Sequence, residues 1–145
     1  MTTPQAQPVT AMSETECWAE LSSRTLGRLA TSVDGYPDIV PVNYIVQRRT
    51  ILIRTAEGTK LASATINPRV AFEADDHDVA QGWSVVVKGQ AHVLSSSEEL
   101  AAAERAQVLP WVLTPKHRFI RIEPMEIRGR RFQFGVEPEH LYDFG

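Results

Sequence analysis

Apolar and polar residues alternate along much of the chain, a pattern that predicts strands with one face turned toward a core. In three places the apolar spacing changes to a helical period, once before the first strand pattern and twice between later ones. The expected strands cover residues 27–33, 38–46, 69–74, 82–94 and 118–132, with another that begins at Ile51, and the expected helices start at Ser13, Lys60 and Glu98.

Local signals mark the ends of several of these elements. Ser13 followed by Glu16 matches a capping box, so a helix is expected to begin there and to end at Gly27. Asp34-Gly35 is a strong hairpin signal, because both residue types tolerate the left-handed backbone of the tight turn. Asn67-Pro68 is expected to end the helix that starts at Lys60, since proline disfavours helical geometry in the residue before it.

Other positions indicate irregular strands or turns. Pro41 cannot donate to a strand ladder, which implies an edge, a bulge or a place where the sheet opens. Gly89 lies inside the longest strand pattern and predicts a bulge. Pro124 is expected to interrupt the last strand. Residues 75–78, Asp-Asp-His-Asp, are expected to form a polar turn, and no fixed ligand spacing favours a metal site there.

About six short strands with hairpin-like connections and two or three helices indicate an α+β fold built on a small antiparallel barrel. A doubly wound parallel sheet is disfavoured, because strands and helices do not alternate regularly. The length of 145 residues suits one domain. We expect residues 1–12 to form a flexible N-terminal tail, residues 13–134 the domain, and residues 135–145 a C-terminal tail.

Composition narrows the class of protein. The formal net charge of -3 argues against a general nucleic-acid binder, which would be basic. Cys17 is the single cysteine, so an intrachain disulfide is excluded, and its place on an apolar helical face suits a small core residue. The first ten residues lack the pattern of a signal peptide, and no apolar run of about 18 residues predicts a membrane span. We therefore expect a cytoplasmic protein.

The stretch from Ile51 to Leu61 passes from a strand pattern through a glycine-containing turn into a helix. Such a turn presents free backbone N–H groups and the positive end of a helix dipole, which suits a phosphate. Lys60 in the first helical turn works against the dipole unless an anion is bound there. The alternative is an ordinary strand-to-helix connection with a solvated lysine.

Four segments follow one another in an order and spacing that resemble a known family. They are Pro41-Val42-Asn43-Tyr44, Ile53-Arg54-Thr55-Ala56, Gly58-Thr59-Lys60-Leu61 and Gly82-Trp83-Ser84-Val85-Val86-Val87. From about Ser13 to Phe132 the chain resembles the pyridoxamine 5'-phosphate oxidase-like FMN-binding split-barrel family. The resemblance implies a split β-barrel and a homodimer whose flavin lies between the subunits.

The resemblance also implies roles for individual residues. Arg54, Thr55, Thr59 and Lys60 would hold the ribityl phosphate of FMN, and backbone groups of Pro41, Val42 and Asn43 would meet the edge of the isoalloxazine ring. The remaining candidates for the cofactor cleft are Ala56, Leu61, Trp83, Ser84 and Trp111, of which Trp111 could reach the cofactor of the partner subunit. For the two tryptophans, packing in a core or interface is the alternative.

No side-chain constellation for catalysis is visible in the sequence. The serines lack a Gly-x-Ser-x-Gly elbow, the four histidines are scattered without metal-ligand spacing, and the Glu-Gly-Thr-Lys turn lacks the first glycine of a nucleotide-binding loop. Cofactor chemistry remains, in which the protein supplies binding and orientation. The leading hypothesis is an FMN-dependent oxidoreductase acting on a small organic substrate.

Two alternatives keep the same fold. One replaces FMN by 8-hydroxy-5-deazaflavin, and the other is a non-enzymatic protein that binds flavin or haem. The C-terminal part of the chain carries a basic stretch that has two interpretations, a solvated strand face or an attraction for a phosphorylated cofactor. Its members are Arg121, Arg128, Arg130 and Arg131.

Overall fold

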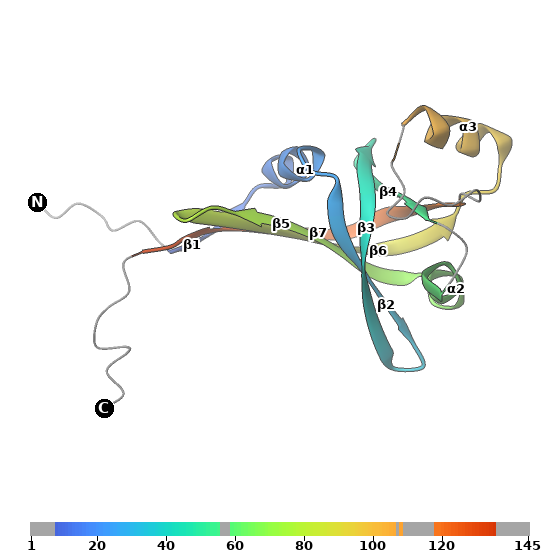
Figure 1. Ribbon diagram of the computed structural model, residues 1–145, viewed down its shortest axis with the longest axis horizontal. Helices are drawn as coiled ribbons and strands as arrows, with labels where there is room; N and C mark the ends of the chain where they lie inside the picture. Colours follow the sequence, from blue (N-terminus) through green and yellow to red (C-terminus); the bar gives the residue numbers. More distant parts are fainter. Residues whose placement is uncertain (1–7, 56–58, 107, 109–117, 136–145) are drawn as a thin grey trace, which may run out of the picture.

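Seven antiparallel strands form one strongly curved sheet in the computed structural model, which describes residues 8–55, 59–106, 108 and 118–135 (Figure 1). The strands are β1 (Val9–Met12), β2 (Leu26–Val33), β3 (Tyr36–Gln47), β4 (Thr50–Thr55), β5 (Arg69–His77), β6 (Gln81–Val93) and β7 (Arg118–Gln133). The helices among the described residues are α1 (Glu14–Ser22), α2 (Thr59–Ile66) and α3 (Ser97–Arg105).

The sheet closes into a barrel through its longest strand. The strand order is β1-β7-β4-β3-β2-β5-β6, and β6 pairs with β7 as well, so six strands form a ring. One edge of β7 is shared between two partners, because Ile122 pairs with Ile51 of β4 and Gly129 pairs with Met12 of β1. The expectation of an α+β fold on a small antiparallel split barrel is confirmed.

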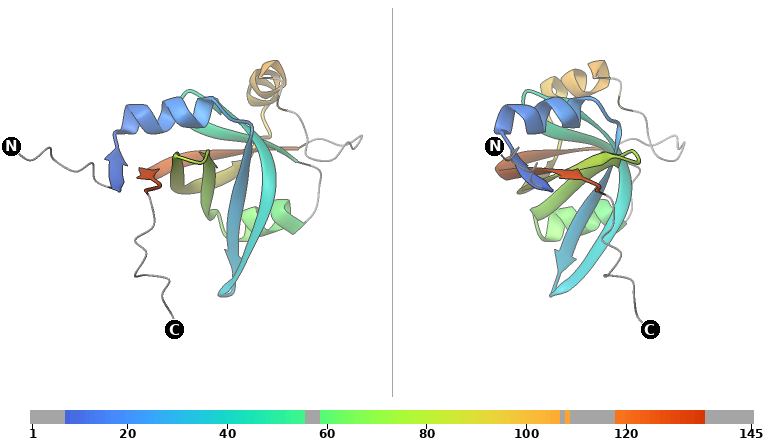
Figure 2. Two further views of the ribbon diagram at one scale, coloured as in Figure 1. Left: turned by 60° about the vertical axis from the view of Figure 1, so that its left-hand side comes forward. Right: turned by 90° about the vertical axis from the view of Figure 1, so that its left-hand side faces the viewer.

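The helices cover different sides of the sheet. In both views of Figure 2, α1 lies above the sheet and α2 lies below it. Helix α1 begins at the predicted capping box, in which the Ser13 hydroxyl accepts from the Glu16 amide at 3.1 Å and the Glu16 carboxylate accepts from the Ser13 amide at 3.3 Å. Tyr44 ties α1 to the barrel, because its hydroxyl donates to the carbonyl of Leu21 at 2.6 Å.

Side chains alternate along each strand between the packed interior of the barrel and its outer face. Tyr44 and Phe72 meet edge to face inside the barrel, with ring centroids 4.6 Å apart. Cys17 of α1 is buried in the same core, as expected. A second, smaller core lies under α3 and includes Leu52 and Phe119.

Several boundaries differ from the sequence prediction. Residues 9–12, expected in the tail, form β1. Helix α1 ends at Ser22 instead of at Gly27. Residues 75–77 continue β5 instead of forming a polar turn, and β7 runs through Pro124, which lies where the β6–β7 register shifts.

Two predicted irregularities are confirmed. Asp34 and Gly35 both have positive φ, 50° and 80°, at the β2–β3 hairpin. The β6–β7 register shifts between Lys88 and Gly89, where an irregularity was expected, and the extra residue, Met125, lies on β7. A Cβ at Gly89 would overlap the carbonyl of Glu123. The hairpin turn needs residues that tolerate a left-handed backbone, whereas Gly89 is needed because a side chain there would collide with β7.

Candidate functional site

Strands β3 and β4 part at a fork that contains several predicted site residues. Their last pair is Tyr44 with Ile53, so Asn43 and Arg54 are the first residues beyond the shared ladder. Residues 36–43 of β3 continue along β2, and no described strand pairs with their other edge. The opening expected at Pro41 is therefore present, with Asn43 on one side and Arg54 on the other.

The open edge of β3 presents backbone groups that a ligand can reach. The amide of Tyr44 donates to the carbonyl of Thr25 at 2.9 Å, toward β2. Because backbone groups alternate in direction along a strand, the N–H and C=O of Asn43 and the C=O of Pro41 face the open edge. Pro41 has no N–H, so it presents no unpaired backbone donor at this edge.

Arg54 carries an unsatisfied donor beside this fork. Its guanidinium carbon lies 5.8 Å from the centroid of the Phe119 ring, and its Nη1 donates to the carbonyl of Val108 at 3.2 Å. Its Nε is buried and has no hydrogen-bond partner among the described residues. A buried donor of this kind is costly unless something accepts from it, and a phosphate oxygen is a suitable acceptor.

The other predicted cofactor contacts near the fork lie on β3, β4 and α2. Val42 and Thr55 are buried, with 1% and 2% of their surface exposed, so their side chains face the interior. Thr59, Lys60 and Leu61 form the first turn of α2, which packs against β2 and β6. Ala56 and Trp111 lie outside the described residues.

Trp83 and Ser84 are far from the fork within one chain. They are neighbours on β6, so their side chains project from opposite faces of the sheet. Trp83 pairs with Arg131 of β7, whereas Arg54 pairs with Phe119. These two positions on β7 are separated by roughly 40 Å of strand at 3.3 Å per residue. One chain therefore cannot bring Trp83 or Ser84 to the same cleft as Arg54.

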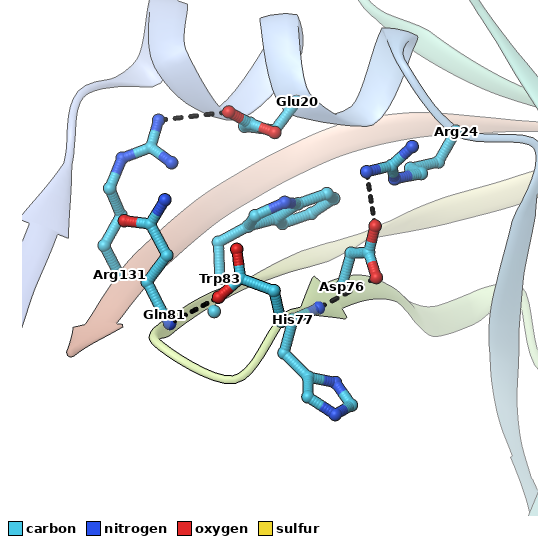
Figure 3. Close-up of a pocket in the computed structure, with 9 residues that line it drawn as sticks. Glu20, Arg24, Asp76, His77, Gln81, Trp83 and Arg131 are labelled. Carbon is cyan, nitrogen blue, oxygen red and sulfur yellow. Dashed lines mark hydrogen bonds and ion pairs between the residues drawn. The ribbon is translucent and has the colours of Figure 1, made fainter. Parts of the chain in front are cut away.

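Trp83 instead forms the floor of a polar pocket of about 270 Å³ between α1 and the β5–β6 turn (Figure 3). The indole lies between two ion pairs, Arg131 with Glu20 at 3.2 Å and Arg24 with Asp76. Because each cation already faces a carboxylate, the pocket has little excess charge with which to attract an ion.

A charged cluster lies on the outer face of the barrel. Arg28 of β2 contacts two carboxylates of β5, Glu73 at 2.8 Å and Asp75 at 3.3 Å. Burial, together with the neighbouring Asp75 carboxyl, raises the pKa of Glu73 to about 7. Ile39 of β3 belongs to the same face and is 61% exposed. Sequence patterns did not reveal this cluster, because its members are about 45 residues apart.

The described part of the chain contains neither a metal-ligand cluster nor a membrane-spanning helix. No group of three or more histidine, cysteine, aspartate or glutamate side chains is arranged there to hold a metal ion. Among the described helices, none has the length and apolar character needed to cross a membrane.

Comparison with known proteins identifies the family. The model of the pyridoxamine 5'-phosphate oxidase family matches residues 13–131. The chain belongs to the pyridoxamine 5'-phosphate oxidase-like family.

Particular relatives extend this finding. The protein Rv3129 from Mycobacterium tuberculosis is 55% identical over 100 residues, which cover 69% of this chain and 91% of Rv3129. The FAD binding protein from Mycobacterium smegmatis is 54% identical, with a TM-score of 0.76, over 86% of this chain and 99% of that protein. A FAD-binding protein from Mesorhizobium loti is 28% identical, with a TM-score of 0.75, over 85% of this chain and 96% of that protein.

Proposed function

We propose that this protein binds a flavin nucleotide at the β3–β4 fork and acts as a flavin-dependent oxidoreductase on a small organic substrate. The observation that carries the proposal is the 54% identity to the FAD binding protein of Mycobacterium smegmatis over nearly its whole length. FMN, the cofactor implied by the family resemblance, makes up the ring, ribityl chain and first phosphate of FAD. The same fork would therefore serve either nucleotide.

The residues at the fork fit such a group. Arg54 supplies a buried Nε that no described residue contacts by a hydrogen bond, and a phosphate oxygen would satisfy it. Lys60 and Thr59 stand at the first turn of α2, where the free amides and the dipole favour an anion. The exposed backbone of Pro41 and Asn43 offers acceptors and a donor to the polar edge of a flavin ring.

The site would be completed by a second copy of the chain. Trp83 and Ser84 are too far along β7 from Arg54 to share a cleft with it in one chain, but an isologous dimer brings the β6 of one copy toward the fork of the other. The outer face supports such a contact, because Ile39 and Leu26 are exposed there at 61% and 42%. A cytoplasmic homodimer is the form of the protein that this proposal implies.

A bound flavin would supply the hydride or electron transfer. The chain would bind the phosphate through Arg54 and Lys60, orient the ring along the β3 edge, and shield one side of it with the second copy. We assign no general acid or base at the fork, because its described side chains are Asn43, Arg54 and the buried Thr55.

The test begins with the visible absorption spectrum of the purified protein and mass spectrometry of whatever denaturation releases. Titrations with FMN, FAD and 8-hydroxy-5-deazaflavin then compare the three cofactors in the wild type and in Lys60→Ala. We expect a flavin spectrum and a flavin affinity that is at least about tenfold weaker in Lys60→Ala, the loss of one charge-assisted contact. Failure of both FMN and FAD to bind would overturn the proposal, and tight binding without turnover would limit it to a flavin carrier.

A further inference from the structure

The four arginines of the C-terminal basic stretch have different surroundings in the fold. Arg121 donates to Thr50 Oγ1 at 2.7 Å and to Gln47 Oε1 at 2.9 Å. Arg131 faces inward and pairs with Glu20 and Glu16 of α1 at 3.2 and 3.5 Å. These two arginines therefore have structural partners, and the outer face of β7 retains Arg128 and Arg130.

Arg128 and Arg130 line a shallow outer hollow of about 240 Å³ with Phe132 of β7 and Ser84 and Val86 of β6. The only ion pair that the described residues give Arg128 is with the exposed Glu126, at 3.5 Å. Arg130 has no hydrogen bond or ion pair within the described part of the chain. The hollow thus combines one guanidinium group that pairs only with an exposed glutamate, one without a partner among the described residues, a serine hydroxyl and an aromatic ring.

Nearby acids neutralise this hollow only in part, because Glu126 contacts Arg128 and no described acid contacts Arg130. Asp75 lies opposite Ser84 across the β5–β6 ladder, but it contacts Arg28 at 3.3 Å. Glu73 contacts the same arginine. The outer face therefore holds a charge cluster on β2 and β5, in which Arg28 contacts both carboxylates, and Arg130 on β7, a cation without a partner among the described residues, which favours a bound anion.

The position of the hollow connects it with the flavin cleft. Ser84 is, with Trp83, one of the two β6 residues that the family resemblance implies at the cofactor, and Arg130 is its direct partner across the β6–β7 ladder. Side chains directly opposite each other in an antiparallel pair have Cβ atoms about 5 Å apart. A copy that brings Ser84 to the flavin of its partner therefore brings Arg130 as well.

We propose that Arg128, Arg130, Ser84 and Phe132 bind the adenosine phosphate half of FAD, so that the protein selects FAD over FMN. This inference rests on the proposed flavin site at the fork of the other copy. The guanidinium groups and the serine hydroxyl would hold the second phosphate, and Phe132 would stack against adenine. FMN lacks this half of the molecule and would gain nothing from Arg128, Arg130 and Phe132.

The experiment compares the affinities of FAD and FMN, measured by calorimetry at fixed ionic strength, in the wild type, Arg130→Gln and Arg105→Gln. Arg105 is an exposed arginine in the last turn of α3, so its substitution makes the same change in charge elsewhere. We expect Arg130→Gln to weaken FAD binding about tenfold, the loss of one charge-assisted contact, with FMN binding unchanged. Arg105→Gln should change neither affinity.

A second variant and a second probe guard against indirect effects. Arg128→Gln should weaken FAD binding less than Arg130→Gln does, because Arg128 already faces Glu126. ADP should bind the wild type and compete with FAD, and Arg130→Gln should reduce its affinity to the same degree. The proposal is overturned if Arg130→Gln weakens FAD and FMN equally or leaves both unchanged. Failure of both flavins to bind the wild type would instead remove the flavin site itself.

Discussion

Asn43 and Arg54 are the first residues of β3 and β4 beyond the last pair of their shared ladder, Tyr44 with Ile53. Their separation opens a strand edge beside a buried guanidinium nitrogen that has no partner in the part of the chain that the structure describes. A closed ladder at this point would satisfy the β3 backbone internally and leave no acceptors or donors for a ligand. The fork is thus both an interruption of the sheet and the basis of the proposed site.

The first prediction concerns Arg54. Arg54→Gln should weaken flavin binding about tenfold to a hundredfold, because it removes a charge-assisted contact to the phosphate. Arg54→Lys should recover only part of the affinity, since lysine keeps the charge but lacks the Nε donor and the planar guanidinium group. Titration of both variants, with thermal melts to confirm folding, measures this. Full affinity in Arg54→Gln would place the phosphate elsewhere.

The second prediction concerns the outer face. Ile39→Glu should convert a dimer into a monomer and weaken flavin binding, because it places a charge in the proposed interface. Val79, 97% exposed in the turn after β5, provides the matched control, and Val79→Glu should change neither property. Light scattering coupled to size-exclusion chromatography, followed by flavin titration, tests both variants. A dimeric Ile39→Glu protein with normal affinity would contradict the two-copy site.

The third prediction concerns pH. The pKa of Glu73 is raised from its ordinary value of 4.5 to about 7, so the folded state binds a proton more readily than the unfolded state between these values. Stability contributed by this group should therefore fall as pH rises from about 4.5 to about 7. Glu73→Gln should remove this dependence and raise stability relative to wild type above pH 7. Urea unfolding at several pH values measures it, and parallel profiles would refute the assignment.

The fourth prediction concerns the contact between α1 and β7. A Cβ on Gly129 would lie 2.5 Å from Cys17 Sγ and 2.9 Å from Met12 Sδ. Gly129→Ala should destabilise the protein by about 1–3 kcal/mol, the usual cost of overpacking a core. Adding Cys17→Ala should recover part of the loss, since the two sites share one space. Gly135→Ala, with no atom near its Cβ, should be close to neutral in the same unfolding assay.

Local chemistry explains which features of the fold were predictable. Asp34-Gly35 was identified because its residues are typical of left-handed turns, whereas Arg48 and Arg49 adopt φ of 52° and 53° without any such preference in their side chains. The four residues of β1 were missed because three of them are exposed, which leaves no alternating pattern to detect. Long-range pairing, not local pattern, places this strand on β7.

The candidate site was predictable only in part for the same reason. The segments around Asn43 and Arg54 are joined by a short hairpin, so their proximity follows from the sequence. Trp83 and Ser84 were expected in one cleft, but adjacent residues of a strand face opposite sides, and only the ladder with β7 shows how far they lie from Arg54. The charge cluster of Arg28, Glu73 and Asp75 depends on strands that are distant in sequence.

Pro41 has a consequence for solubility as well as for ligand access. A strand edge with free donors and acceptors is a template on which another extended chain can add, the first step of edge-to-edge aggregation. At the open edge of β3 the proline removes one donor from that template. Pro41, which leaves the fork open to a small planar ligand, thus also makes the β3 edge less able to pair with a strand of another molecule.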